Sequence, residues 1–264
     1  ADAAYAPRDG WVAEFGGETA FVIIKHTNAC GVATGASVKD AYVKAFQADT
    51  ISAFGGVLAT NNAVDLEAAE EMNKLFFEIL VAPSYSEEAL KILRSKKNRM
   101  LLLQKQGLSE TKQAKTILNG LIEQDLDLRT DTRNDLKVVT RKAPGSSEIN
   151  ALLFASKICK HTKSNTIVLA VEGQLLASGV GQTSRVDALK QAIEKAAAFG
   201  LSLQGAVMAS DAFFPFPDCV EIAHSHGICA VIQPGGSVKD QESINFCDQH
   251  NMSMVFTGIR HFKH

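Results

Sequence analysis

Short apolar runs alternate with stretches of helical period along nearly the whole chain, and this alternation constrains the fold more than any other feature. The runs are typical of buried strands, and the polar segments between them are long enough to form helices. Strand–helix alternation predicts an α/β fold with a mostly parallel sheet and helices on its faces. We expect two halves that divide near residue 136, namely 1–136 and 137–264. The expected strands are 20–24, 79–82, 99–103, 166–171, 206–209, 229–233 and 254–256.

Capping residues mark several of the expected helices. Ser84 and Glu87 match a capping box for a helix that runs to about residue 95. Gly200 follows an Ala-rich segment and suits the position just after a helix. The polar, weakly periodic segment 104–134 predicts a connector with one short helix around 110–121. The other expected helices are 65–77, 147–160, 184–199, 220–226 and 239–250.

Composition narrows the class of protein. Lys and Arg number 27 against 29 Asp and Glu, a net charge of −2, so no basic field attracts nucleic acid. No apolar run approaches the roughly 18–20 residues that span a bilayer, and the N-terminus lacks the pattern of a secretion signal. The five cysteines contain no Cys-x-x-Cys pair, which predicts reduced thiols and no zinc site. We therefore expect a cytoplasmic protein without a membrane or nucleic-acid partner.

An aromatic loop, Ser-Asp-Ala-Phe-Phe-Pro-Phe-Pro-Asp at 210–218, follows the expected strand 206–209. In α/β proteins the loop at the carboxyl end of a parallel strand is where ligands bind. Phe213, Phe214 and Phe216 could form a stacking platform for a flat ring, with Asp211 and Asp218 as acceptors. A hydrophobic plug that closes the end of the sheet explains the loop equally well.

Lys25 and His26 follow the expected strand 20–24 and could form an acid–base pair. A neighbouring ammonium disfavours the protonated imidazole, which leaves His26 able to act as a base. Lys25 could polarise a carbonyl or protonate a leaving nitrogen. An exposed polar strand end is the simpler interpretation of the same residues, and Cys30 nearby is a minor candidate for a nucleophile.

Other short motifs are individually weak. Two glycines in 52–56 allow close approach of a ligand, and Asn165 could orient an amide. The segment 179–185 precedes an expected helix and could hold an anion with the help of Arg185, and 234–237 offers a second such position. Neither the P-loop nor the dinucleotide fingerprint occurs. The cationic end, 258–264, is either a solvated tail or part of a site.

Taken in order, these motifs resemble the transformylase domain of the bifunctional purine-synthesis enzymes, which acts on aminoimidazole carboxamide ribonucleotide (AICAR). The resemblance covers residue 16 to the C-terminus, and the combination of motifs is far more specific than any one of them. The matching segments are 25–31, 52–56, 163–165, 181–185, 210–216, 233–237 and 260–264.

The resemblance implies two tandem cytidine-deaminase-like subdomains that work as a homodimer, with active sites at the subunit interface. The implied reaction transfers a formyl group from the co-substrate 10-formyltetrahydrofolate to the 5-amino group of AICAR, giving formyl-AICAR. The His-x-Glu and Pro-Cys-x-x-Cys signatures of the zinc deaminases are missing, so the resemblance to deaminases concerns the fold only. Whether a monovalent cation binds stays open.

Residue roles carry over by resemblance at matching positions. His26 would take the amine proton, Lys25 would stabilise the oxyanion or protonate the leaving folate nitrogen, and Asn165 would orient the substrate. The implied nucleotide contacts are Gly55, Glu78, Arg185, Phe213 and Arg260, the implied pterin and formyl contacts are Phe54, Phe216 and Asp218, and His264 is matched without a role.

Two departures from the family pattern leave an alternative open. Nothing here corresponds to the cyclohydrolase domain, and residues 1–15 do not match the Arg-Tyr-Gly-x-Asn-Pro-His-Gln segment that helps to hold the nucleotide phosphate. The chain therefore looks like a fragment in which phosphate binding and dimer formation are in question. The alternative is a non-catalytic module that binds nucleotide or folate. A zinc nucleoside deaminase is a third, weaker hypothesis.

Overall fold

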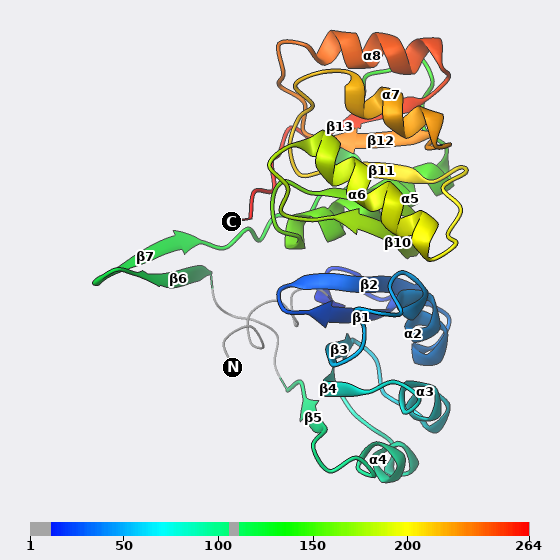
Figure 1. Ribbon diagram of the computed structural model, residues 1–264, viewed down its shortest axis with the longest axis vertical. Helices are drawn as coiled ribbons and strands as arrows, with labels where there is room; N and C mark the ends of the chain where they lie inside the picture. The colour runs from blue at the N-terminus through cyan, green and yellow to red at the C-terminus, as the bar shows by residue number, and fades with distance from the viewer. Residues whose placement is uncertain (1–11, 106–110, 264) are drawn as a thin grey trace.

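One eleven-stranded mixed sheet organises the chain in the computed structural model, which describes residues 12–105 and 111–263 (Figure 1). The strands lie in the order β5-β4-β3-β1-β2-β10-β9-β11-β12-β13-β8. Their bounds are β1 Thr19–Lys25, β2 Asn28–Gly35, β3 Gly56–Thr60, β4 Phe77–Ala82, β5 Met100–Leu103, β8 Lys137–Val138, β9 Ile167–Val171, β10 Gln174–Gly179, β11 Val207–Ser210, β12 Ala230–Gln233 and β13 Ser253–Phe256.

The two ends of the sheet repeat one topology. In the first, β1 is antiparallel to both β2 and β3, and β3, β4 and β5 are parallel. In the second, β9 is antiparallel to both β10 and β11, and β11, β12 and β13 are parallel. Strands β2 and β10 meet at the centre, where Gln174 pairs with Ala33. The expectation of a mostly parallel sheet is therefore correct only for β3, β4 and β5 and for β11, β12 and β13, because each repeat contains an antiparallel hairpin and β8 is antiparallel to β13.

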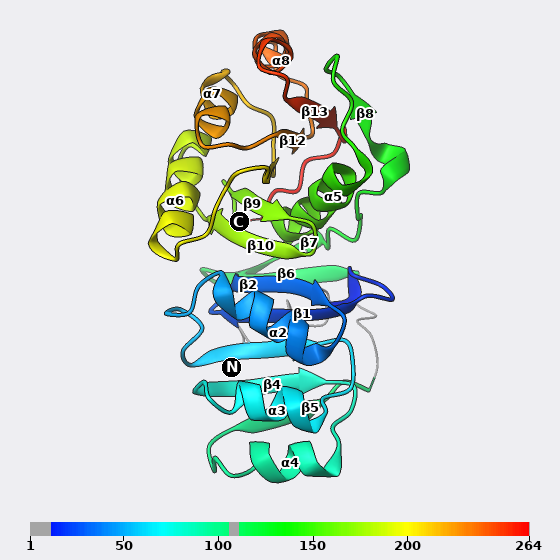
Figure 2. The same ribbon diagram turned by 90° about the vertical axis from the view of Figure 1, so that its right-hand side faces the viewer.

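Helices cover both faces of this sheet. One face carries α2 (Val38–Gln47), α3 (Leu66–Met72), α4 (Glu87–Leu93), α6 (Arg185–Ala198), α7 (Asp218–Ser225) and α8 (Asp240–Gln249) over two apolar clusters, one in each repeat. The opposite face carries α5 (Ser146–His161), and Figure 2 shows α5 across the sheet from α6 and α7. The cluster under α5 joins residues of both repeats, among them Val22 and Leu152.

The register of the strands brings one set of strand ends to a common edge, called here the site edge. Lys25 at the end of β1 pairs with Asn28 at the start of β2, and Ile167 at the start of β9 pairs with the ends of β10 and β11. Since β2 and β10 are antiparallel, the start of β2 and the end of β10 lie at the same edge. Every motif that could hold a ligand is close to one of these ends.

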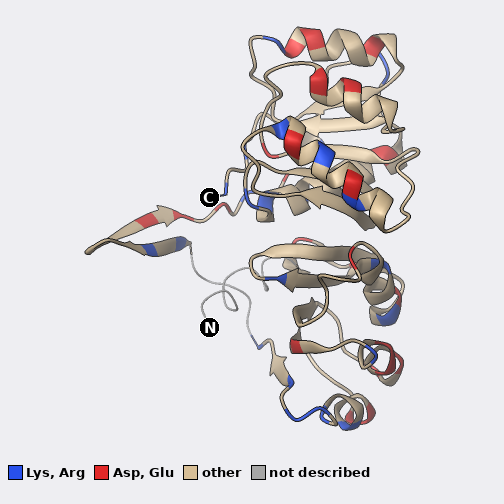
Figure 3. Cartoon of the chain, viewed as in Figure 1, with Lys and Arg blue, Asp and Glu red and all other residues tan. Residues whose placement is uncertain are grey.

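The segment 112–125 is a β-hairpin, and the expected short helix at 110–121 is wrong. Strands β6 (Lys112–Ile117) and β7 (Gly120–Asp125) pair only with each other and project from the body of the molecule (Figure 1). Asn119-Gly120, between alternating side chains, is a hairpin signal that outweighs weak helical periodicity. Strand β6 contains lysines and strand β7 contains carboxylates, as Figure 3 shows.

Other boundaries also differ from expectation. The cap of α4 is Ser86, whose side chain accepts from the amide of Ala89, rather than Ser84. The helix that begins after Asp65 ends at Met72, because Phe77 already belongs to β4. Strands β2, β3 and β10 and helix α2 were not expected. The short 3-10 helix η2 (Arg133–Asp135) lies in the connector before β8.

Candidate functional site

The turn of the β1–β2 hairpin presents Lys25 and His26 at the site edge. His26 is exposed and has a φ of +56°, so it occupies the left-handed region in a two-residue turn. Lys25 and His26 were expected just past a strand that ends at Ile24, whereas β1 extends to Lys25 and residues from Asn28 onward return as β2. The tight turn nevertheless fixes the lysine and the histidine as neighbours at the end of a buried strand.

The lysine is held by the segment that precedes β3. Lys25 Nζ donates a hydrogen bond of 2.6 Å to the carbonyl of Phe54. Gly55 has a φ of +66°, its amide donates to the carbonyl of Phe76 at 2.8 Å, and a Cβ there would lie 3.1 Å from Lys25 Nζ. The rings of Phe54 and Phe76 lie 5.1 Å apart and are 61% and 50% exposed. Together they form an aromatic shelf (Phe54 and Phe76) beside the ammonium group.

A second cluster lies where β9 begins and α6 starts. Asn165 Nδ2 donates to the carbonyl of Thr183 at 3.2 Å. Arg185, the first residue of α6, pairs with Asp211 at 3.3 Å, and the side chain of Asp211 is fully buried. Arg185 Nε and Asp211 Oδ2 are buried without a hydrogen-bond partner among the described residues. Asp211 therefore orients Arg185 through one carboxylate oxygen, and its role as an acceptor for a ligand ring stays a prediction.

In the aromatic loop 210–218, one phenylalanine fits the hydrophobic plug and another is exposed enough to form part of a stacking platform. Phe214 is fully buried and its amide donates to Gln233 Oε1 at 3.2 Å, so this residue does plug the end of the sheet. Phe213 is half-buried, while Phe216 is 51% exposed with Lys239 Nζ 4.6 Å from its ring centre. Asp218 begins α7 and accepts from the amide of Cys219.

The remaining expected contacts are exposed. Glu78 lies near the start of β4 with its side chain in solvent. Arg260 is exposed, and its guanidinium lies 5.4 Å from the ring centre of Phe262. His264 lies outside the described residues.

Hydrogen bonds donated by backbone amides connect the β1–β2 hairpin, the segment before β9, Asp211 and the C-terminal segment. The amide of Lys163 donates to Asn28 Oδ1 at 3.3 Å. The amide of Ser164 donates to the carbonyl of Lys263 at 2.9 Å, and the amide of His261 donates to the carbonyl of Asp211 at 3.1 Å. Within the described residues no hydrogen bond joins Lys25 or His26 directly to Asn165, Arg185 or Phe213.

A buried polar network behind the C-terminal segment was not expected from the sequence. His261 pairs with Asp127 at 2.6 Å and with Asp131 at 3.3 Å. Burial would lower the pKa of His261, but the two carboxylates outweigh it and raise this pKa to about 9. Burial lowers the pKa of Lys263 to about 8. The cationic end was visible in the sequence, whereas its acidic partners lie in the connector, more than a hundred residues away.

A second part of this network ties the N-terminal segment to α5. Glu14 pairs with Lys160 at 2.5 Å and with His161 at 3.1 Å, and it accepts from the hydroxyl of Thr130. Burial would raise the pKa of Glu14, but these hydrogen bonds lower it to about 2. Glu14 is therefore a carboxylate at neutral pH, and it anchors the chain ahead of β1.

The described part of the chain gives little support for a cysteine nucleophile, a metal site or a membrane-spanning helix. Burial raises the pKa of Cys30 to about 11, so its thiol stays protonated and is a poor nucleophile. Within residues 12–105 and 111–263, no group of three or more His, Cys, Asp or Glu side chains is arranged so that it could hold a metal ion. In the same residues no helix has the length and apolar character needed to cross a bilayer.

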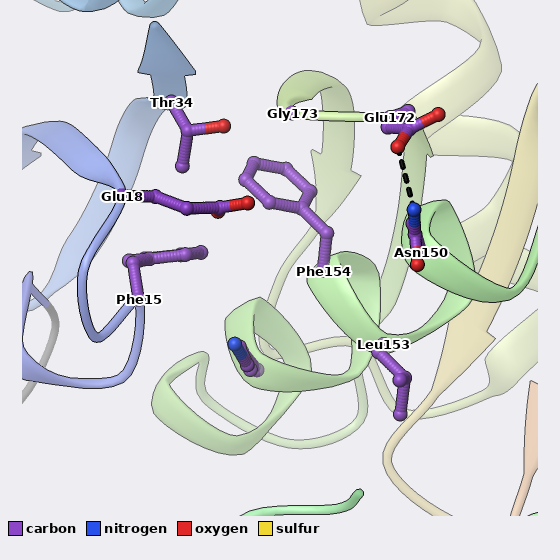
Figure 4. Close-up of a pocket in the computed structure, with 9 residues that line it drawn as sticks. Phe15, Glu18, Thr34, Asn150, Leu153, Phe154, Glu172 and Gly173 are labelled. Carbon is purple, nitrogen blue, oxygen red and sulfur yellow. Dashed lines mark hydrogen bonds between the residues drawn. The ribbon is translucent and has the colours of Figure 1, made fainter. Parts of the chain in front are cut away.

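A cavity of about 340 Å³ opens at the junction of the two repeats, on the side of α5 (Figure 4). Phe15 and Phe154 meet across it with ring centres 5.3 Å apart, and Glu172 on its rim accepts from Asn150. None of the residues expected to hold a ligand lines this cavity. The candidate site is therefore the group of side chains at the site edge, outside this cavity.

Comparison with known proteins supports one family. The family model described as "AICARFT/IMPCHase bienzyme" matches residues 1–195. The "Bifunctional purine biosynthesis protein PurH" of Bacteroides thetaiotaomicron is 60% identical over 244 residues, which is 92% of this chain and 48% of that protein. The proteins of the same name from Aquifex aeolicus and Acetivibrio thermocellus are each 51% identical over 96% and 94% of this chain, and over 49% and 48% of their own length. The chain thus spans about half the length of the curated relatives it matches, and it belongs to the AICARFT/IMPCHase bienzyme family.

Proposed function

We propose that this chain carries the AICAR transformylase step, in which a formyl group moves from 10-formyltetrahydrofolate to the 5-amino group of AICAR. One observation carries the proposal. The Lys25–His26 turn, the aromatic shelf and the Arg185–Asp211 pair all lie at one edge of the sheet, and hydrogen bonds through residues 163–164 link the β1–β2 hairpin to the C-terminal segment. The relatives are named for purine biosynthesis, so a purine precursor is a fitting acceptor.

The chemistry required suits these side chains. The amine of AICAR is conjugated with its ring and is a weak nucleophile, so its attack on the formyl carbon needs a base. His26 takes the proton as the new C–N bond forms, and Lys25 stabilises the oxyanion of the tetrahedral intermediate. The bond from the formyl carbon to folate N10 then breaks, and N10 leaves with a proton donated by Lys25 or by the protonated His26. Asn165 holds the AICAR amine or carboxamide in line for attack.

Binding roles follow from chemistry and exposure. Arg185 and Arg260 supply cations for the nucleotide, with Gly55, Glu78 and Phe213 completing its contacts. Phe54, Phe216 and Asp218 contact the pterin and formyl side, which is consistent with the exposure of both rings. No resident metal is required by this mechanism.

We further propose that residues 1–136 and 137–264 are two tandem cytidine-deaminase-like subdomains of a cytoplasmic homodimer. The repeated strand order supports the division. A dimer with active sites at the interface would bring Lys25 and His26 of one copy toward residues of the other, which suits the lack of a direct hydrogen bond between the two clusters in the described chain.

A non-catalytic module that binds nucleotide or folate is the second candidate. It is favoured by one observation, namely that no hydrogen bond within the described residues joins Lys25 or His26 directly to Asn165 or Arg185. In this case the residues at the site edge would bind AICAR without turning it over.

The two candidates are separated by a formyl-transfer assay with 10-formyltetrahydrofolate and AICAR. We expect His26→Ala to lower kcat by about 10²- to 10⁴-fold, the range typical for a general base. His224→Ala, which removes an imidazole from α7, serves as the matched control and should leave kcat unchanged. AICAR binding in calorimetry without turnover by the unmodified chain would support the binding module, and full activity of His26→Ala would refute the proposed base.

A further inference from the structure

A buried carboxylate beside the segment that holds Lys25 is paired across the boundary between the two repeats. Asp49 follows α2, and its side chain is only 2% exposed. Asp49 Oδ2 lies 2.6 Å from Nζ of Lys195, which is in the last turn of α6. The pair therefore connects the first repeat to the second on the face of the sheet that carries α2 and α6. Neither residue has a part in the mechanism above.

The other carboxylate oxygen of Asp49 shapes the turn that leads to β3. Asp49 Oδ1 accepts a hydrogen bond of 2.8 Å from the amide of Ser52. Two residues further along, the carbonyl of Phe54 accepts from Lys25 Nζ at 2.6 Å. A continuous series of contacts therefore runs from Lys195 through the carboxylate of Asp49 and this turn to the ammonium group of Lys25.

The charge of Asp49 is balanced where it is buried. Burial alone would raise the pKa of this carboxyl, but the hydrogen bonds from Lys195 and Ser52 lower it below the usual value. Asp49 is thus a carboxylate at neutral pH, and each of its oxygens has a donor. A buried carboxylate that lost its ammonium partner would be strongly destabilising, so the pair holds the turn firmly against α6.

Helix α6 connects this pair to the proposed nucleotide contact. Arg185 begins α6 and Lys195 lies in its last turn, so one helix carries both cations. One end of α6 supplies a proposed contact for the nucleotide, and the other end, through Asp49, fixes the segment that holds Lys25. A shift of about 1 Å between the two would move the ammonium away from the reacting atoms, which is costly in a reaction that depends on alignment.

We propose that Asp49 and Lys195 are positioning residues that hold the carbonyl of Phe54, and through it Lys25, in a fixed place relative to the start of α6. Their effect on formyl transfer rests on the proposed function. Both residues act through Lys25, so their loss should change the rate of the chemical step more than the binding of AICAR.

The kinetic test removes the pair without leaving a buried charge. In Asp49→Asn/Lys195→Met the new amide can still accept from Ser52, while the contact with α6 is lost. We expect kcat for formyl transfer to fall about 10- to 100-fold, KM for AICAR to stay within about twofold, and the urea midpoint to stay close to that of the unmodified chain. Lys195→Arg keeps the cation and should retain most of kcat.

Lys142→Met/Glu148→Gln is the matched control, because it removes an ion pair within the second repeat whose lysine is 33% exposed, against 31% for Lys195. This control should keep the kcat of the unmodified chain. An unchanged kcat in Asp49→Asn/Lys195→Met, or an equal fall in both variants, overturns the positioning role.

A measurement that does not depend on turnover separates this proposal from the proposed function. Acetylation of Lys25 by limiting acetic anhydride is followed by mass spectrometry, with the exposed Lys91 of the same chain as internal reference. Release of Lys25 from the Phe54 carbonyl should raise its relative rate about 2- to 10-fold in Asp49→Asn/Lys195→Met and not in the control, since one hydrogen bond is lost.

Unchanged reactivity of Lys25 overturns the positioning role, whether or not the chain transfers a formyl group. Raised reactivity together with a fall in kcat supports both proposals. Raised reactivity in a chain whose unmodified form transfers no formyl group supports the hold of Asp49 and Lys195 on Lys25 and overturns the proposed reaction.

Discussion

Gly55 is a point where backbone conformation and the expected catalytic lysine meet. Its φ of +66° is costly for any residue with a Cβ, and that Cβ would lie 3.1 Å from Lys25 Nζ. We expect Gly55→Ala to lower the free energy of unfolding by about 1 kcal/mol through backbone strain and to displace the ammonium from the Phe54 carbonyl. Formyl transfer should fall more than the loss of stability can explain, as measured by steady-state kinetics beside urea denaturation.

Gly200→Ala is the matched control for this prediction. Gly200 has a similar φ of +68°, but a Cβ there meets nothing within 4 Å. The Gly200→Ala variant should lose a similar amount of unfolding free energy and keep the kcat of the unmodified chain. Equal kcat values for the two variants would show that the position of Lys25 does not matter for the reaction.

The single side chain of His261 makes the free energy of unfolding depend on pH. Its pKa is about 9 in the folded chain against about 6.5 in an unfolded one, so its pairing with Asp127 and Asp131 stabilises fully below pH 6.5. This contribution, of up to about 3 kcal/mol, is lost as pH rises through about 9. Urea denaturation should therefore show a larger fall in the free energy of unfolding between pH 6.5 and 9.5 for the unmodified chain than for His261→Gln. The same pH dependence of the free energy of unfolding in both chains would contradict a contribution from His261.

Local sequence could identify the candidate side chains but not their partners. The Lys-His pair, Arg185 and Phe216 are exposed or near strand ends, where a motif read along the chain places them. Asp211 was expected to face a ligand, yet it is buried against Arg185, because an ion pair between residues 26 positions apart leaves no local signal. The same holds for Asp127 and Asp131, which meet His261 only in the folded chain.

At the scale of elements, two of the strands that the sequence did not predict, β2 and β10, are strands against which a helix packs closely. A Cβ on Gly31 in β2 would lie 1.8 Å from the carbonyl oxygen of Ala45, and one on Gly179 in β10 would lie 1.8 Å from that of Ala188. Glycine is required where helix and strand backbones approach so closely, and it dilutes the apolar pattern by which strands are recognised. The expected strands 79–82, 166–171 and 229–233, which pack through large side chains, match β4, β9 and β12 to within a few residues.

This close contact predicts a severe effect of a single methyl group. Gly179→Ala must push α6 away from β10, because the obstacle is backbone rather than a flexible side chain. We expect a loss of about 3 kcal/mol or more in the free energy of unfolding, at the upper end for overpacking. Gly17→Ala, where a Cβ meets nothing within 4 Å, should be nearly neutral in the same urea titration. A neutral Gly179→Ala would mean that α6 does not pack on β10 as described.

The β6–β7 hairpin should be the least protected sheet element of the described chain. Its two strands pair only with each other, and Ile117, Leu118 and Leu121 are 50%, 99% and 64% exposed. Isolated two-stranded hairpins are marginally stable in water, so amide exchange there should be much faster than in β1, measured by hydrogen–deuterium exchange and mass spectrometry. Protection comparable to that of β1 would contradict this and indicate a partner that covers the hairpin.

At the scale of the whole molecule, the sequence indicated two halves but gave no sign of how they join. Their strand orders repeat, and the Lys-His-Thr repeat at 25–27 and 160–162 does not mark equivalent positions. The halves join through β2 and β10, which meet at the centre of the sheet, and through a core that α5 shares with both. Such a junction depends on contacts between residues more than a hundred positions apart, which periodicity along the chain does not encode.

The shared core predicts that both repeats unfold together. Leu152 in α5 is fully buried in one apolar cluster with Val22 and Ile24 of β1 and Ile232 of β12. Leu152→Ala should therefore lower the free energy of unfolding by about 2–5 kcal/mol and shift the urea midpoints for exchange in β1 and in β12 by the same amount. Leu80→Ala, in the cluster confined to the first repeat, is the matched control for cavity size. If Leu152→Ala moved the midpoint of β12 while that of β1 stayed in place, the repeats would be separate folding units joined only at the backbone ladder, and α5 would belong to the second repeat alone.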